Sequence, residues 1–171
     1  MPWISERPAE VEDRAVPGHW EGDLLIGRDG KSAVGTLVER RTRHVLLLAL
    51  PHGRSAELVR AALAERVLTL PEQLRRTLTW ERGKEMAEDV RFTIDTGVQV
   101  HFRDPHSPWQ RVSNEHPNGL LRQYFPKGTD LSVLGQEHLD AVARELNGRP
   151  RQTLDWMTPS EAFAAVDAMT G

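Results

Sequence analysis

Apolar positions alternate along the first part of the chain in a way that predicts three strands. Residues 19–27 (HWEGDLLIG) and 32–40 (SAVGTLVER) each predict a strand, and Asp29-Gly30 between them is a strong signal for a tight hairpin turn. The next run, 45–50 (VLLLAL), is apolar on both faces, which indicates a central strand. The short links between these runs predict consecutive antiparallel pairing.

Helical periodicity dominates the rest of the chain. After the candidate cap Ser55, apolar residues recur at helical spacing as far as Leu70, and Pro71 ends the predicted helix. Two more strands are predicted at 76–80 and 98–102; each follows a helix and should lie parallel to its neighbour. The remaining predicted helices cover residues 84–97, 112–125, 137–147 and a last segment that begins with a capping box at Thr158, Pro159 and Glu161.

The resulting order of elements is β-β-β-α-β-α-β-α-α, which is the ribonuclease-H-like arrangement. We therefore expect an α/β fold with a mixed five-stranded sheet in the order 3-2-1-4-5, flanked by helices. The predicted division is an extended arm over residues 1–18, a catalytic core over 19–150, and a helical tail over 151–171 that packs on the core.

Composition narrows the class of protein. The 171 residues include no cysteine, which excludes disulfides and thiolate metal sites and fits a reducing compartment. We see no signal peptide, and the longest apolar run, 45–50, is too short to span a membrane, so we expect a cytoplasmic protein without a membrane partner. The net charge of −3 does not indicate a nucleic-acid-binding protein, although bases and histidines gather within residues 101–127.

Three acids are candidates for chemistry, and each has an ordinary structural explanation when it is taken alone. Asp23 lies inside a predicted strand, where it would simply face water at an edge. Glu81 ends the fourth predicted strand and suits a turn or a surface ion pair. Glu115 lies early in a helix, where the dipole favours an acid and Arg111 could pair with it.

Together the three acids form a more specific pattern. Strands one and four are neighbours in the predicted order, so Asp23, Glu81 and Glu115 can converge. Like charges a few ångströms apart need cations, and ligation by oxygen alone favours Mg²⁺ or Mn²⁺. Two such ions about 3.5–4 Å apart can support phosphoryl transfer. The sequence does not support a phosphate-binding loop. Gly-Lys-Ser occurs at residues 30–32, but that motif also requires a glycine five positions earlier, where this chain has Leu25.

Five longer stretches closely resemble the catalytic domain of insertion-sequence-30 family transposases. They are PGHWEGDLLIG, GTLVERRTRHVLLL, TLTWERGKEM, GVQVHFRDPHSPWQRVSNE and NGLLRQYFPKGTDLS, and ELNGRPRQTLDWMTPSEAF resembles the tail of that domain. The resemblance covers about residues 3–166 and implies a DDE transposase or integrase core. The family triad falls on Asp23, Glu81 and Glu115, with the family's separation of 33 residues between the second and third acids.

The resemblance also implies function, partners and location. It implies metal-dependent DNA cleavage and strand transfer with two Mg²⁺ or Mn²⁺ ions, in a bacterial, nucleoid-associated protein. The expected partners are transposon ends, target DNA and further copies of the chain in a dimer or higher oligomer, with no small-molecule substrate. Beside the triad, Arg111, Lys127, Trp109 and Asn114 are expected to contact DNA or to orient the site.

The sequence departs from the family pattern in ways that predict weak activity. The family has Trp-Asp-x-Gly at the second acid, whereas this chain has Trp80-Glu81-Arg82-Gly83. Val112 replaces a usual glycine and His116 a usual asparagine. The family's N-terminal helix-turn-helix region is not in the sequence, so we expect an excised domain or a truncated reading frame.

Two other functions stay open at this point. The chain is an inactive remnant, or a regulator that dimerises with an intact transposase, if Glu81 cannot hold a metal. It is a small ribonuclease-H-like nuclease if it cleaves DNA without joining it. A strand-transfer assay with Mg²⁺ and Mn²⁺ in parallel separates these outcomes.

Overall fold

The centre of the molecule is one five-stranded sheet. The computed structural model describes residues 16–80, 88–102 and 119–170. The strands lie in the order β3-β2-β1-β4-β5, as the sequence predicted. Their bounds are β1 His19–Ile26, β2 Ala33–Glu39, β3 Val45–Ala49, β4 Thr77–Trp80 and β5 Gln99–Phe102.

The direction of each strand follows from the length of its connection. Strands β1, β2 and β3 are antiparallel neighbours joined by short links, whereas β4 and β5 each follow a longer crossover and pair in parallel. The link from β1 to β2 is the predicted turn. Asp29 and Gly30 have φ values of 55° and 69°, and the Lys31 amide donates to the Arg28 carbonyl at 3.1 Å.

Helices cover the sheet on both faces, and α2 and α6 begin at the predicted caps, whereas the starts of the predicted helices 84–97 and 112–125 lie outside the described residues. The helices are α2 Ala56–Val67, α3 Asp89–Thr96, α5 Gln136–Asn147 and α6 Pro159–Thr170, with 3-10 turns at Arg28–Gly30, Glu72–Leu74, Leu131–Val133 and Gln152–Leu154. Residues 119–124 are also helical. Ser55 caps α2 by accepting from the Leu58 amide at 3.3 Å. Thr158 and Glu161 form the predicted reciprocal capping box, with both bonds at 3.0 Å.

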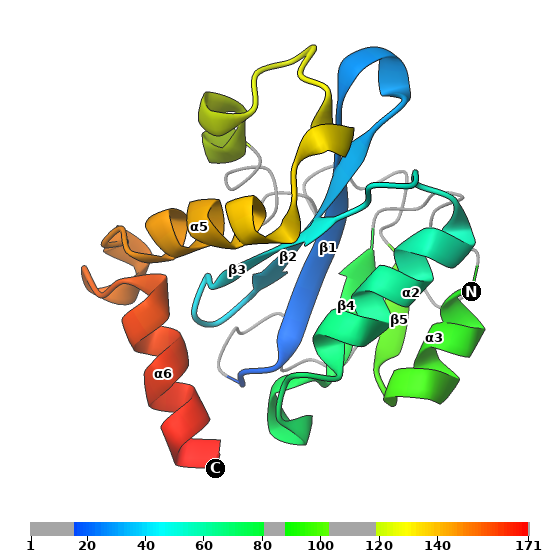
Figure 1. Cartoon of the computed structure of the whole chain (residues 1–171). Coiled ribbons are helices and arrows are strands. Elements are labelled where there is room, and N and C mark those ends of the chain that lie inside the picture. Colours follow the sequence, from blue (N-terminus) through cyan, green and yellow to red (C-terminus); the bar gives the residue numbers. More distant parts are fainter. Residues whose placement is uncertain (1–15, 81–87, 103–118, 171) are drawn as a thin grey trace.

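The two faces of the sheet build two separate apolar clusters. On one face, Trp20, Leu37 and Leu78 pack with buried residues of α2 and α3. On the other, Leu25, Val34 and Leu47 pack with buried residues of α5 and of the segment 119–134. Figure 1 shows α2 and α3 together beside β4 and β5, and α5 alongside β3.

Strand β3 is not central, so the prediction drawn from its apolar composition is wrong. It lies at the edge of the sheet. Its open edge is covered by α5: Asn147 exchanges two hydrogen bonds with the Val45 backbone, at 2.8 and 2.9 Å, and Gln136 bonds the Leu47 carbonyl at 2.7 Å and the Ala49 amide at 2.9 Å. These amides take the place of a neighbouring strand at the edge. Strand β3 is apolar on both faces because each face packs in one of the two clusters, Leu46 and Leu48 in the first and Val45 and Leu47 in the second.

Across the described ranges 16–80, 88–102 and 119–170, there is no helix with the length and apolar character that crossing a membrane requires.

Candidate functional site

Asp23 lies in the middle of the central strand β1, so it is not the water-facing edge residue of the ordinary interpretation. Its side chain is partly buried, and its Oδ1 accepts from the Leu24 amide at 2.8 Å. Its carbonyl accepts from the Thr36 hydroxyl on β2 at 3.2 Å. Because side chains alternate along a strand, Asp23 shares a face with Leu25, on the side of the sheet that α5 covers. The carboxylate therefore has a fixed backbone and a defined face.

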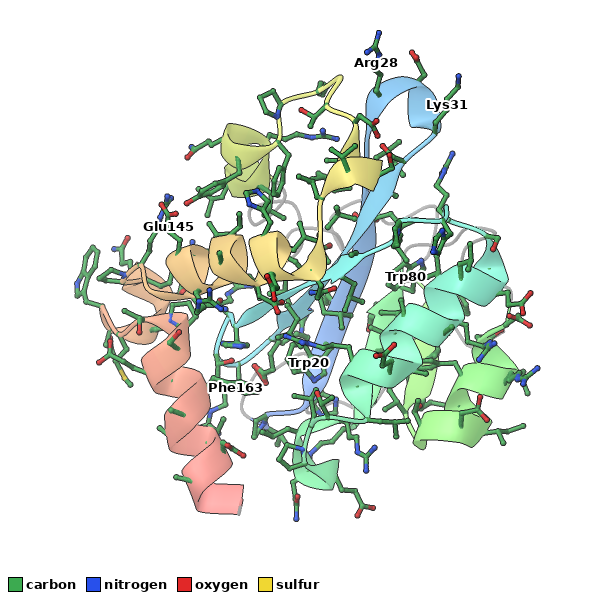
Figure 2. The ribbon with its side chains drawn as sticks, viewed as in Figure 1. Trp20, Arg28, Lys31, Trp80, Glu145 and Phe163 are labelled. Atoms are coloured by element: carbon green, nitrogen blue, oxygen red, sulfur yellow. The ribbon has the colours of Figure 1, made fainter. Side chains whose placement is uncertain are left out.

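Trp80 fixes the register between β1 and β4 next to Asp23. Gly22 is the last described partner of β4 on β1, and it pairs with Trp80, the last residue of β4. A Cβ on Gly22 would lie 2.3 Å from two carbons of the Trp80 ring. The ring, which is 2% exposed, thus lies directly against the backbone of β1. Figure 2 shows Trp80 between the sheet and α2. Only glycine permits this approach.

A buried ion pair lies beneath Asp23 on the same face of β1. Glu21 is two residues before Asp23, is 0% exposed, and pairs with Arg40, which is 5% exposed. A buried pair of this kind holds its partners in place, because breaking it leaves an uncompensated buried charge. The sequence analysis did not consider Glu21. In HWEGDLLIG, Glu21 lies two residues before Asp23, so strand alternation could have placed both acids on one face. Nothing in the sequence indicated that Arg40 is the partner of Glu21.

Glu39 shows that a buried acid in this fold can be purely structural. Its carboxylate accepts from the Gly18 amide at 3.0 Å, from the Thr42 amide at 2.7 Å and from the Thr42 hydroxyl at 3.0 Å. Burial raises the pKa of Glu39 above its usual value, although these hydrogen bonds act in the opposite direction. Glu39 therefore holds the entry to β1 and the turn after β2, at the end of β1 opposite to the hairpin.

Of the other predicted site residues, the structure describes only Lys127. Lys127 is exposed in a turn after the helical residues 119–124. Glu81, Glu115, Trp109, Arg111 and Asn114 lie outside the described residues, and the structure neither supports nor contradicts their predicted roles. Within the described residues alone, no three His, Cys, Asp or Glu side chains gather as a metal site would require.

Comparison with protein families gives one match that spans more than half of the chain. Residues 13–108 match the family described as "Integrase core domain". The matched range includes Asp23 and Glu81 and ends before Glu115. It also includes the whole five-stranded sheet.

Two relatives match nearly the whole chain. The transposase for insertion sequence element IS1086 of Cupriavidus metallidurans is 54% identical over 163 residues, which is 95% of this chain and 48% of the relative. The transposase InsI for insertion sequence element IS30C of Escherichia coli is 48% identical over 167 residues, 98% of this chain and 43% of the relative. The chain thus spans less than half the length of either relative.

Two solved structures share the fold at low sequence identity. The catalytic core domain of the integrase of BIV superposes with a TM-score of 0.64 at 14% identity, over 90% of this chain and 97% of that one. A chain of the simian T-cell lymphotropic virus intasome, solved in complex with the PP2A regulatory subunit B56 gamma, gives a TM-score of 0.66 at 15% identity, over 86% and 54% of the two chains. These likenesses confirm the ribonuclease-H-like fold.

The family match, the relatives and the strand order agree with the resemblance that the sequence motifs indicated. The chain belongs to the integrase core domain family and corresponds to the core region of insertion-sequence-30 transposases.

Proposed function

We propose that this chain is the metal-dependent strand-cleaving and strand-joining core of a DNA transposase, with Asp23, Glu81 and Glu115 as its catalytic acids. The names of the relatives support transposition as the process, and the integrase core family supports the class of chemistry. The activity of the whole protein is part of the proposal, because the chain spans less than half of those relatives.

The observation that carries this proposal is the pairing of β1 with β4. The last described pair is Gly22 with Trp80, and the next residue on each side is an acid, Asp23 after Gly22 and Glu81 after Trp80. We propose that the parallel pairing continues for one more residue on each strand, which would put Asp23 and Glu81 on the face opposite to Trp80. In that continuation the two carboxylates would be neighbours on adjacent strands.

The donor set fits a hard divalent cation. All three acids offer only oxygen, as Mg²⁺ and Mn²⁺ prefer. The partly buried Asp23 carboxylate, held on β1, supplies oxygen of this kind. In the proposed site, Asp23 would be a ligand of two such ions, and Glu81 and Glu115 would each be a ligand of one. The ions would polarise the attacking and leaving oxygens at the phosphate.

The chain's own residues would position the DNA for two successive reactions. In cleavage, a water oxygen forms the new bond to phosphorus and the 3′ oxygen of the cut strand leaves. In joining, that 3′-hydroxyl attacks a target phosphate and displaces the target's own 3′ oxygen. Lys127 and Arg111 would hold backbone phosphates, Trp109 would contact a base, and Asn114 would orient Glu115. We propose that copies of the chain assemble on the DNA.

Glu81 limits this activity in our proposal. It is one methylene longer than the aspartate of the family pattern, and Mg²⁺ tolerates little departure from octahedral geometry at about 2.0–2.1 Å. A displacement on the order of 1 Å can reduce a rate by about 10²-fold. The same substitution favours the second candidate function, an inactive core that dimerises with an intact transposase and inhibits it.

A strand-transfer assay tests both functions. The chain would be incubated with labelled duplex ends and target plasmid, with Mg²⁺ and Mn²⁺ in parallel, beside Asp23→Asn and Glu81→Asp. We expect weak joining with Mn²⁺, weaker joining with Mg²⁺, and none with Asp23→Asn. Joining that persists in Asp23→Asn would contradict the site. No joining by the chain or by Glu81→Asp, together with inhibition of an intact transposase, would establish the second function. Cleavage without joining would indicate a nuclease.

A further inference from the structure

The hairpin that continues β1 beyond Asp23 ends in a cluster of basic side chains. Arg28 and Lys31 flank the Asp29-Gly30 turn and are exposed. Figure 2 shows both side chains projecting from the end of the molecule, away from the helices. Arg54, from the segment before α2, lies against the same turn: its Nε donates to the Gly30 carbonyl at 3.2 Å. We call Arg28, Lys31 and Arg54 the basic tip.

The basic tip is held in place by the neighbouring segments. The Arg28 amide donates to the Thr129 carbonyl at 2.8 Å. Arg122 donates to the Ile26 carbonyl at 3.0 Å, and the Leu131 amide donates to the Ser32 hydroxyl at 2.9 Å. With the bond from Arg54, the hairpin is braced by segments on two sides. A braced hairpin presents its charges in a fixed arrangement, which reduces the ordering needed for binding.

Two exposed acids, Asp29 and Asp130, lie near Arg28 of the basic tip and offset part of its positive charge. Asp29 approaches the Nε of Arg28 at 3.8 Å, but these side chains are 70% and 72% exposed, so the pair is weak. Asp130 is engaged by Ser132, whose amide and hydroxyl donate to Oδ1 at 3.0 and 2.6 Å. Lys127 is an exposed base two residues before Thr129, whose carbonyl accepts from the Arg28 amide. The whole chain has a net charge of −3, so attraction of a polyanion must come from such a local cluster.

The position of the basic tip relates it to the candidate acids. Strands β1 and β4 run parallel, so the end of the sheet where Glu81 follows β4 is also the end where β1 continues into the hairpin. Arg28 is five positions after Asp23 along the chain, roughly 16 Å at the rise of an extended strand. At 3.4 Å per base pair, this is about five base pairs, half a turn of duplex.

We propose that the basic tip is a binding surface for the phosphate backbone of duplex DNA, which it holds about half a turn from the catalytic acids. This inference rests on the proposed function, because it takes the duplex that enters the site as its ligand. Arginine and lysine side chains on a rigid turn suit phosphate contacts, which position the duplex and carry no sequence information. Binding at the basic tip is therefore sequence-independent and strongly dependent on salt.

Binding measured over a range of salt concentrations tests the proposal without any strand chemistry. A labelled duplex of arbitrary sequence would be titrated, without divalent metal, by the unaltered chain and by the double variant Arg28→Gln/Lys31→Gln, from 50 to 200 mM salt. Each lost phosphate contact lowers the slope of log K against log salt by about 0.9. We expect the slope to fall by about 1.8, which corresponds to roughly 60-fold weaker binding at 0.1 M salt.

Two further variants make the result specific. Arg91→Gln removes an exposed arginine from α3, where it lies 3.8 Å from Asp95, and it should leave the slope unchanged. The exchange Arg28→Lys/Lys31→Arg keeps both charges and should retain affinity. Thermal unfolding would confirm that all variants fold. The proposal is overturned if the double variant binds within twofold of Arg91→Gln, or if the charge-keeping exchange loses as much affinity as the double variant.

The binding experiment can fail or succeed independently of the proposed catalytic function. A chain that binds duplex DNA while the double variant keeps the same slope would overturn the basic tip alone. A chain that binds through the basic tip but neither cleaves nor joins DNA with Mn²⁺, even as Glu81→Asp, would overturn the catalytic proposal alone. Absence of duplex binding at 50 mM salt would overturn both.

Discussion

Replacing Gly22 with alanine should displace Trp80 and disturb the candidate site. The new Cβ would lie 2.3 Å from ring carbons Cε3 and Cζ3 of Trp80 and 3.1 Å from Cδ1 of Leu78. The ring must withdraw by more than 1 Å to reach the 3.4 Å of ordinary contact. Overpacking of this kind costs about 1–3 kcal/mol, and the reduced backbone entropy of alanine offsets roughly 0.5–1 kcal/mol of that.

The consequence for activity follows from the position of Trp80. It directly precedes Glu81, so a shift of about 1 Å at the end of β4 should reduce strand transfer by about 10²-fold. The comparison is best made in the Glu81→Asp background, where we expect higher activity. Stability would be measured by urea unfolding of the same proteins.

A matched glycine and a double-mutant cycle isolate the contact. Gly35→Ala on β2 places a Cβ 3.2 Å from the Cβ of Leu48, a contact that a small adjustment can relieve, so its effect should be small. In a Trp80→Leu background the ring is gone, and Gly22→Ala should then cost at least 1 kcal/mol less than it does alone. If Gly22→Ala and Gly35→Ala have equal stabilities, or if the cycle shows no coupling, the reasoning about this contact is wrong.

Three further predictions concern other parts of the molecule. Burial, and then the nearby charge of Arg66, lowers the pKa of His44 from 6.5 to about 4, so protonation of this histidine favours the unfolded chain. The unaltered chain should therefore lose stability as the pH falls from 7 to 5, and in urea unfolding His44→Gln should lose about 2 kcal/mol less over the same range. Asn147→Ala should cost about 2–4 kcal/mol by the same measurement, because it leaves the amide and the carbonyl of Val45 unsatisfied; a cost below 0.5 kcal/mol would contradict this role for α5. Glu81→Asp should raise strand transfer by about 10² or more with little change in DNA affinity; equal rates for the two proteins would show that glutamate is a working ligand here.

Local signals predicted much of the fold because they act within a few residues. The Asp29-Gly30 turn, the Ser55 cap and the capping box at Thr158 all occur as expected, since each depends on backbone geometry that one or two side chains determine. The strand directions followed from the lengths of the connections, and the strand order followed from the ribonuclease-H-like succession of elements. Asp23 was a candidate from its place in a strand, and its central position agrees with that order.

Features that depend on distant residues could not be predicted in the same way. The apolar composition of β3 indicated a central strand because nothing near it in sequence announces the amides of Asn147 and Gln136, which lie 102 and 87 residues away from their partners. Gly22 looked like an ordinary weak position in a strand until the ring of Trp80 was found against it. The partner of Glu21 was equally hidden, since a strand acid has many possible counter-ions.

The central claim is that Asp23 takes part in a metal site formed only in the folded chain. Urea unfolding with and without Mn²⁺ tests it directly, because an ion that binds only the native state stabilises it by about 2.7 kcal/mol at 100 times its dissociation constant. We predict this stabilisation for the unaltered chain and for Asp29→Asn, which removes an exposed acid from the hairpin beyond Asp23, and its loss in Asp23→Asn. An equal Mn²⁺ effect in Asp23→Asn would place the ion elsewhere and contradict the account.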